Sequence, residues 1–176
     1  MAPAASAATR RELIARGIAF GRHGGDVGAL SALARAEQVL VGTYEQLLGS
    51  AVLSPAHGVL ASRLLGHERA HLSALTAQLE RLGGTVPHAP AALGHTAAAG
   101  MAFGDERAAL GMLVSLERAA LAVYYAELGK LRDSRAAQVA AQIMACEAQH
   151  ATTLRDVLEP GRPGRAVPTP FVFGQL

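Results

Sequence analysis

The chain repeats itself at a distance of 79 to 80 residues. A shift of 80 aligns five residues of the first half with identical types in the second: Leu33, Glu37, Tyr44, Leu48 and Gly49 with Leu113, Glu117, Tyr124, Leu128 and Gly129. A shift of 79 aligns three more: Glu68, His71 and Leu75 with Glu147, His150 and Leu154. Leucines coincide easily on helical periods, but paired glutamates, histidines and tyrosines do not. The repeat therefore predicts two equivalent halves.

Apolar residues at three- and four-residue steps predict four long helices. The expected spans run from about residue 26 to 48, 55 to 82, 105 to 131 and 134 to 158. Short links make the first two helices antiparallel neighbours, and likewise the last two. The segment 84–104, rich in Gly, Pro and Ala, is long enough to run the length of a bundle. We expect an all-α fold, a four-helix bundle of two antiparallel hairpins joined by a long crossover.

Two terminal segments flank the expected bundle of residues 26–158. In residues 1–25, the stretch Thr9–Ile14 (TRRELI) resembles the core of a twin-arginine export signal. Charged residues between Arg16 and Asp26 interrupt the apolar segment that such a signal needs. We interpret residues 1–25 as a short amphipathic or disordered leader and expect a cytoplasmic protein; export by the twin-arginine route is the alternative.

The C-terminal segment, residues 159–176, contains four prolines, which disfavour helix. We expect it to be extended. Its two phenylalanines, Phe171 and Phe173, would pack on an apolar surface of the bundle, of a partner or of a second subunit.

Composition narrows the functional classes. No stretch of 18 or more apolar residues runs without a charge, so we expect no membrane span. The net charge is only +2 and no basic run exceeds two residues, which argues against a nucleic-acid groove. Cys146 is the single cysteine, so an intrachain disulfide is impossible. We expect its side chain to be a small buried apolar group.

One short motif allows two interpretations. The sequence His67-Glu68-Arg69-Ala70-His71 matches the H-E-x-x-H pattern of zinc metalloproteases. Alternatively, only Glu68 and His71 matter, as an E-x-x-H element of a two-metal carboxylate site. The second copy of the repeat has a cysteine in place of His67 but keeps the glutamate and histidine. What recurs is E-x-x-H, so we favour the two-metal interpretation and keep the protease as a minor alternative.

The two-metal interpretation uses every repeated polar residue. Positions i and i+3 share a helix face, so the Glu and His of each E-x-x-H point the same way. Four carboxylates buried without a partner would be costly, and two divalent cations would balance their charge. Oxygen and imidazole ligands suit iron or manganese. The predicted metal ligands are Glu37, Glu68, His71, Glu117, Glu147 and His150.

These six residues, in this order, resemble the ferritin-like superfamily over residues 26–158, and look most similar to its small bacterial members. The resemblance implies that Glu68 and Glu147 bridge two Fe ions, with Mn possible, and that the remaining four are terminal ligands. It also implies reaction with O2 or H2O2, as a ferroxidase or a peroxide scavenger, and a homodimer. A metal-binding protein without turnover and a purely structural bundle are the alternatives.

Further residues lie close to these ligands in sequence. Tyr44 and Tyr124 follow Glu37 and Glu117 by seven residues, which places them two turns away on the same helix face. We consider them candidate catalytic residues, as redox-active phenols or donors to a carboxylate; core packing is the alternative. His67 is expected on the surface or in a contact between hairpins.

Overall fold

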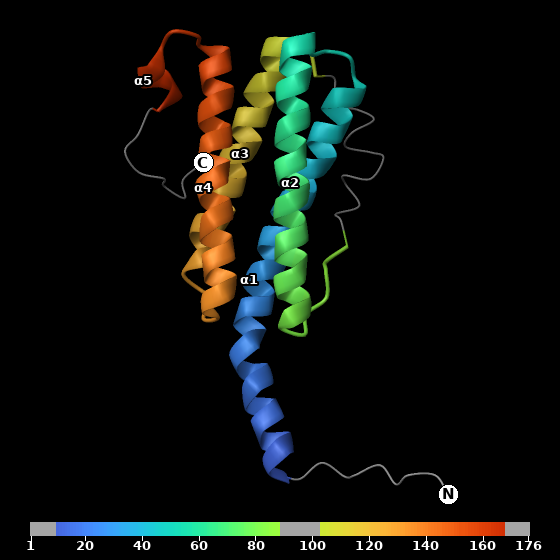
Figure 1. Ribbon diagram of the computed structural model, residues 1–176, viewed down its shortest axis with the longest axis vertical. Coiled ribbons are helices and arrows are strands. Elements are labelled where there is room, and N and C mark those ends of the chain that lie inside the picture. Colours follow the sequence, from blue (N-terminus) through green and yellow to red (C-terminus); the bar gives the residue numbers. More distant parts are fainter. Residues whose placement is uncertain (1–9, 89–102, 168–176) are drawn as a thin grey trace, which may run out of the picture.

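The computed structural model describes residues 10–88 and 103–167, with side chains from residue 24 onward. All the elements in these ranges are helices: α1 (Arg10–Gly49), α2 (Pro55–Arg81), α3 (Glu106–Leu128), α4 (Ser134–Leu158) and the short α5 (Pro163–Ala166). The four long helices lie side by side in one bundle (Figure 1). The predicted all-α fold is confirmed.

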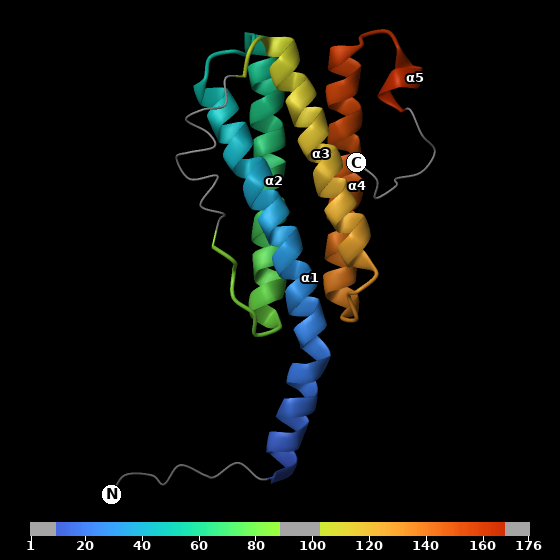
Figure 2. The ribbon, with the colours of Figure 1, turned by 180° about the vertical axis from the view of Figure 1, so that it is seen from behind.

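The four helices form two hairpins. α1 packs against α2 and α3 against α4, while contacts between α1 and α3 and between α2 and α4 join the hairpins (Figure 2). The end of α2 and the start of α3 lie at opposite ends of the bundle, as a long crossover between the hairpins requires (Figure 1). Most of that connection, residues 89–102, lies outside the described residues. The predicted order of two hairpins and one long crossover is confirmed.

Side-chain caps set where three helices begin. The side chains of Ser54, Asp105 and Asp133 each accept a hydrogen bond from the backbone N–H three residues later, at the starts of α2, α3 and α4. Such caps satisfy N–H groups that have no partner within the helix. The predicted starts of these helices agree with the structure to within a residue.

Polar contacts between the hairpins occur at both ends of the bundle. At one end, Oε1 of Glu106 on α3 accepts a hydrogen bond of 2.5 Å from the backbone N–H of Ser54, before α2. At the other end, Oδ1 of Asp26 on α1 accepts one of 2.5 Å from the backbone N–H of Arg132, before α4. The guanidinium of Arg81 on α2 also pairs there with Asp133. These contacts fix the register of one hairpin against the other.

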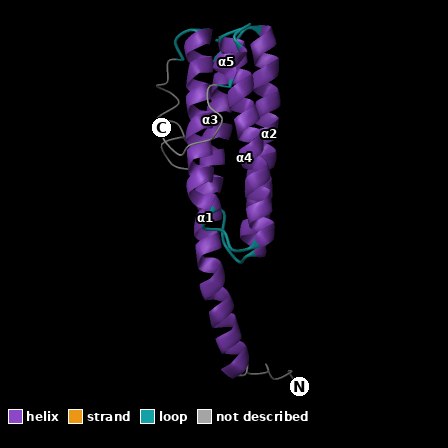
Figure 3. Cartoon of the chain, turned by 90° about the vertical axis from the view of Figure 1, so that its left-hand side faces the viewer, coloured by secondary structure: helices purple, strands orange, loops and turns teal. Residues whose placement is uncertain are grey.

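Two helix boundaries differ from the prediction. α1 begins at Arg10 rather than near Asp26, and its N-terminal part extends past the end of the bundle (Figure 3). α3 ends at Leu128 rather than Leu131 because the chain turns at Gly129. Leu131 nevertheless remains buried, so the apolar pattern continued beyond the helix itself.

The C-terminal segment also corrects an expectation. It was expected to be extended, yet Pro163–Ala166 form the short helix α5, which packs against α4. Pro163 occupies the first turn, where the N–H that proline lacks would have no helical partner. Phe171 and Phe173 lie outside the described residues.

The buried side chains form two apolar clusters, one toward each end of the bundle. The first includes Leu30, Leu33, Leu75, Leu79, Tyr124 and Ile143. The second includes Leu40, Tyr44, Leu47, Leu64, Leu113 and Leu154. On α1, α2 and α4 the predicted ligands lie between residues of the first cluster and residues of the second, and on α3 Glu117 lies between Leu113 of the second cluster and Tyr124 of the first. The predicted site therefore lies between two apolar layers.

One helix of the described part, α3, is long and apolar enough to cross a membrane when judged by length and composition alone. These two criteria do not establish a span. In the bundle, α3 packs against α1 and α4 and carries Glu117, which is fully buried.

Candidate metal centre

The six predicted ligands come together in the middle of the bundle. α1 contributes Glu37, α2 contributes Glu68 and His71, α3 contributes Glu117, and α4 contributes Glu147 and His150, as the prediction requires. The four glutamates are 0% exposed and the histidines 9% and 3%. The centroids of the two imidazole rings are 5.8 Å apart, with the rings nearly parallel.

The contacts repeat with approximate two-fold symmetry. Nδ1 of His71 lies 2.7 Å from Oε1 of Glu147, and Nδ1 of His150 lies 2.9 Å from Oε1 of Glu68. Nδ1 of His71 also lies 3.6 Å from Oε2 of Glu37, and Nδ1 of His150 lies 3.8 Å from Oε2 of Glu117. In each pair the glutamate comes from the other helix of the same hairpin. The sequence repeat is thus reproduced as a structural repeat at the site.

Two groups of donor atoms in this centre could each hold one cation. The first consists of Glu37, Glu68, His71 and Glu147, and the second of Glu68, Glu117, Glu147 and His150. The atoms of each group lie within 4.8 Å of one another. Glu68 and Glu147 belong to both groups, which is the position of bridging carboxylates between two metals.

The donor atoms are close together without being hydrogen-bonded. Both carboxylate oxygens of Glu68 and Glu147, one each of Glu37 and Glu117, and Nδ1 of His71 and His150 are buried without a hydrogen-bond partner. The short contact between His71 and Glu147 therefore lacks the direction of a hydrogen bond. Buried polar atoms of native proteins are nearly all satisfied. Lone pairs that converge in this way fit divalent cations.

The pKa values of the ligand side chains show which of them hold a proton when no metal is bound. Burial raises the pKa of Glu37 to about 8 and that of Glu117 to about 9, because desolvation disfavours the charged carboxylate. Burial by itself would lower the pKa of His71 and of His150, but the surrounding carboxylates raise both to about 12. Burial also opposes ionisation of Glu147, yet the two histidines hold its pKa below its usual range. Without metal, protons balance the buried charge.

The two candidate catalytic tyrosines contact the ligands of the opposite hairpin. The hydroxyl of Tyr124 on α3 donates a hydrogen bond of 2.5 Å to Oε1 of Glu37 on α1, and that of Tyr44 on α1 donates to Oε1 of Glu117 on α3. Burial, followed by the charge of the neighbouring glutamate, raises the pKa of each phenol. Both tyrosines therefore stay protonated and serve as donors to a carboxylate. Each also packs in an apolar cluster, so each tyrosine both donates to a carboxylate and fills the core, while a catalytic role stays a prediction.

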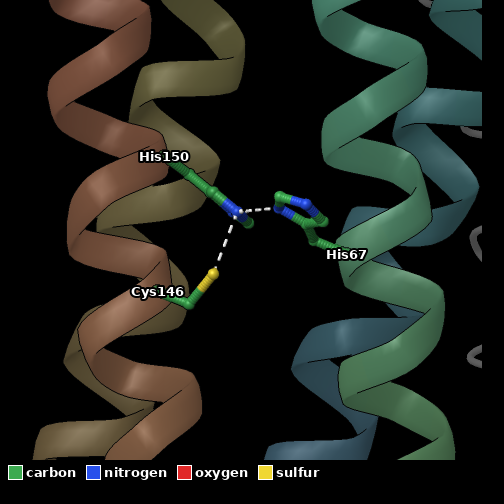
Figure 4. Close-up of side chains that lie close together, drawn as sticks. All are labelled: His67, Cys146 and His150. Carbon is green, nitrogen blue, oxygen red and sulfur yellow. Dashed lines mark hydrogen bonds between the residues drawn. The ribbon is translucent and has the colours of Figure 1, made fainter.

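A third group of donor atoms borders the centre, and the sequence interpretation did not identify it. Nε2 of His150 lies 3.0 Å from Nδ1 of His67 and 3.3 Å from Sγ of Cys146 (Figure 4). His67 makes a contact between hairpins, as expected. Cys146 is only partly buried and its sulfur faces an imidazole, so its assignment as a buried apolar group was wrong. A signal existed: the 79-residue shift aligns His67 with Cys146.

The geometry does not favour the zinc protease. That interpretation needs His67 and His71 as ligands of one ion. Among the described residues, no potential metal group combines them; His67 groups with Cys146 and His150 instead.

Comparison with known proteins agrees with this architecture. A crystal structure of a conserved hypothetical protein from Mycobacterium tuberculosis superposes with a TM-score of 0.67 at 21% identity, covering 77% of this chain and 98% of that one. At this identity the likeness concerns the fold alone. No curated protein matches the sequence. Residues 25–160 match the family of the ferritin-like domain. Since that match covers most of the chain, the protein belongs to the ferritin-like domain family.

Proposed function

We propose that the protein is a di-iron carboxylate protein that reacts with O2 or H2O2, as a ferroxidase or a peroxide-reducing protein. One observation carries the proposal: buried carboxylate and imidazole atoms converge in two overlapping groups without hydrogen-bonding one another. Apolar side chains would stabilise a purely structural bundle at these positions better than four buried glutamates, because burying a carboxylate costs desolvation free energy even when it is paired.

The donor set favours iron, with manganese as the second choice. Each group offers three carboxylates and one imidazole, and oxygen and nitrogen ligands of this kind suit Fe and Mn. A bound pair of iron ions would supply electrons to the oxidant. Two divalent cations would also match the charge of the four carboxylates.

Each residue of the proposed centre would have a distinct role. Glu68 and Glu147 would bridge the two ions, while Glu37 and Glu117 would each serve one. Tyr124 and Tyr44 orient these two terminal carboxylates through their hydrogen bonds. The apolar clusters on either side keep bulk water from the centre and strengthen electrostatic interactions within it.

Aerobic oxidation of bound Fe²⁺ tests the proposal. Protein loaded with Fe²⁺ under anaerobic conditions should develop ferric absorption in the near-ultraviolet when O2 or H2O2 is added, faster than free Fe²⁺. Glu68→Ala should abolish the acceleration. Glu80→Ala is the matched control, because Glu80 is an exposed carboxylate on the same helix. Two bound irons that do not react with either oxidant would indicate metal binding without turnover and contradict the proposal.

A further inference from the structure

The third donor group lies where α2 and α4 face each other, beside the six-residue centre, with which it shares His150. It consists of Nδ1 of His67, Sγ of Cys146 and Nε2 of His150, all within 4.8 Å of one another. His67 is exposed, Cys146 partly buried and His150 almost fully buried. The three side chains point toward one another from two helices (Figure 4). The group therefore runs from solvent to the edge of the proposed di-iron centre.

Hydrogen bonding does not account well for this arrangement. Nε2 of His150 carries at most one hydrogen, so it can donate to His67 or to Cys146, but not fully to both. If Nε2 instead carries a lone pair, it can accept a hydrogen bond from His67 or from Cys146, and again one of the two is left without a full hydrogen bond. A cation at the meeting point would satisfy the imidazole nitrogens and the sulfur at once.

We propose that His67, Cys146 and His150 form an outer site for a thiophilic divalent cation, such as Zn²⁺. Two imidazole nitrogens and one thiolate are ligands that Zn²⁺ prefers, and three protein ligands leave a fourth position for water. The thiol and the protonated ring of His150 each lose a proton to solvent when the ion binds. Exposure of His67 gives the ion access from solvent.

The outer site shares His150 with the proposed di-iron centre. His150 presents Nδ1 to Glu68 in the inner group and Nε2 to the outer one. Because a neutral imidazole has a single lone pair, the ring binds fully at one site at a time. A thiophilic ion at the outer site should therefore weaken iron binding at the inner site. This competition rests on the proposed function, whereas the outer site itself does not.

Titration of the metal-free full-length protein with Co²⁺, a spectroscopic substitute for Zn²⁺, tests the outer site. We expect a thiolate-to-cobalt charge-transfer band. Cys146→Ser should abolish it, and His67→Ala should weaken the binding that produces it by more than about tenfold. His88→Ala, which removes an exposed histidine elsewhere, should change nothing.

Two further points keep the result decisive. His67 is exposed, so its alanine variant tests the site even if substitution of the partly buried Cys146 disturbs folding. Glu37→Ala removes an inner ligand only and should retain the thiolate band, which separates failure of the outer site from failure of the di-iron proposal. Co²⁺ bound without a thiolate band, or a band unchanged in His67→Ala, would overturn the outer site.

Discussion

The hydroxyl of Tyr124 donates a hydrogen bond of 2.5 Å to Oε1 of Glu37, which belongs to the other hairpin. In the same way, the hydroxyl of Tyr44 donates a hydrogen bond to Oε1 of Glu117 in the opposite hairpin. Each hairpin thus orients a carboxylate of the other, and the two contacts follow the sequence repeat. Both phenols are 0% exposed, so they hold these carboxylates without help from solvent.

Removing one phenol hydroxyl should loosen the metal site while sparing the fold. Tyr124→Phe keeps the ring in its apolar cluster but frees an oxygen of Glu37. Loss of such an outer contact typically weakens metal affinity about 10- to 100-fold. Competition titration with a chelator would measure this for Fe²⁺. Tyr125→Phe is the control, since Tyr125 is 57% exposed. Equal affinities in the two variants would refute an orienting role.

The metal-free protein should lose stability as pH rises above about 4.5, first through the two glutamates and above about 6.5 also through the histidines. The folded-state pKa values of Glu37, Glu117 and both histidines all lie above their ordinary values. The folded state therefore binds more protons than the unfolded state across this range, and unfolding becomes easier as they are lost. Urea denaturation at pH 6, 7, 8 and 9 would show it. A free energy of unfolding that stays constant or rises toward pH 9 would contradict this charge balance.

Glu37→Gln should remove part of that pH dependence. The amide resembles the protonated carboxyl but cannot ionise, so the metal-free variant should match the wild type only below about pH 4.5, where the carboxyl is protonated in both the folded and the unfolded chain. At pH 9 it should exceed the wild type by more than about 1 kcal/mol, because the buried charge no longer forms. The same substitution should weaken metal binding. Glu80→Gln provides the exposed control, and identical pH profiles for all three proteins would count against the assignment.

Metal binding should release protons. Near pH 7, Glu37, Glu117, His71 and His150 hold protons in the metal-free protein, since their pKa values are about 8, 9, 12 and 12. Two divalent cations would displace about four protons. Calorimetric titration in buffers of different ionisation enthalpy measures this number. Release of fewer than about two protons would show that the metal-free centre is balanced in another way.

Much of the architecture could be predicted from the sequence, because each signal is local. Apolar periodicity and capping residues located α2 and α4 closely, and the repeat predicted the hairpins. The spacing within E-x-x-H placed Glu68 beside His71 and Glu147 beside His150. The structure brings all six predicted ligands together; their binding of metal stays a prediction.

The remaining features depend on how one hairpin sits against the other. The periodicity of α1 placed Tyr44 near Glu37, but the register between α1 and α3 aims its hydroxyl at Glu117 instead. Cys146 and His150 are four residues apart on α4, so helical spacing could have predicted their contact. The contact of His150 with His67, by contrast, depends on how α2 packs against α4. Helical spacing alone does not specify such contacts.

Anaerobic equilibrium titration with Fe²⁺ tests the central claim most directly. The wild-type chain should bind about two Fe²⁺ ions at the inner centre. Glu68→Ala and Glu147→Ala should each lose both, because these residues belong to both donor groups. Glu80→Ala should keep both. A wild type that binds one ion or none, or a Glu68→Ala variant that still binds two, would contradict a centre in which these carboxylates bridge a pair of cations.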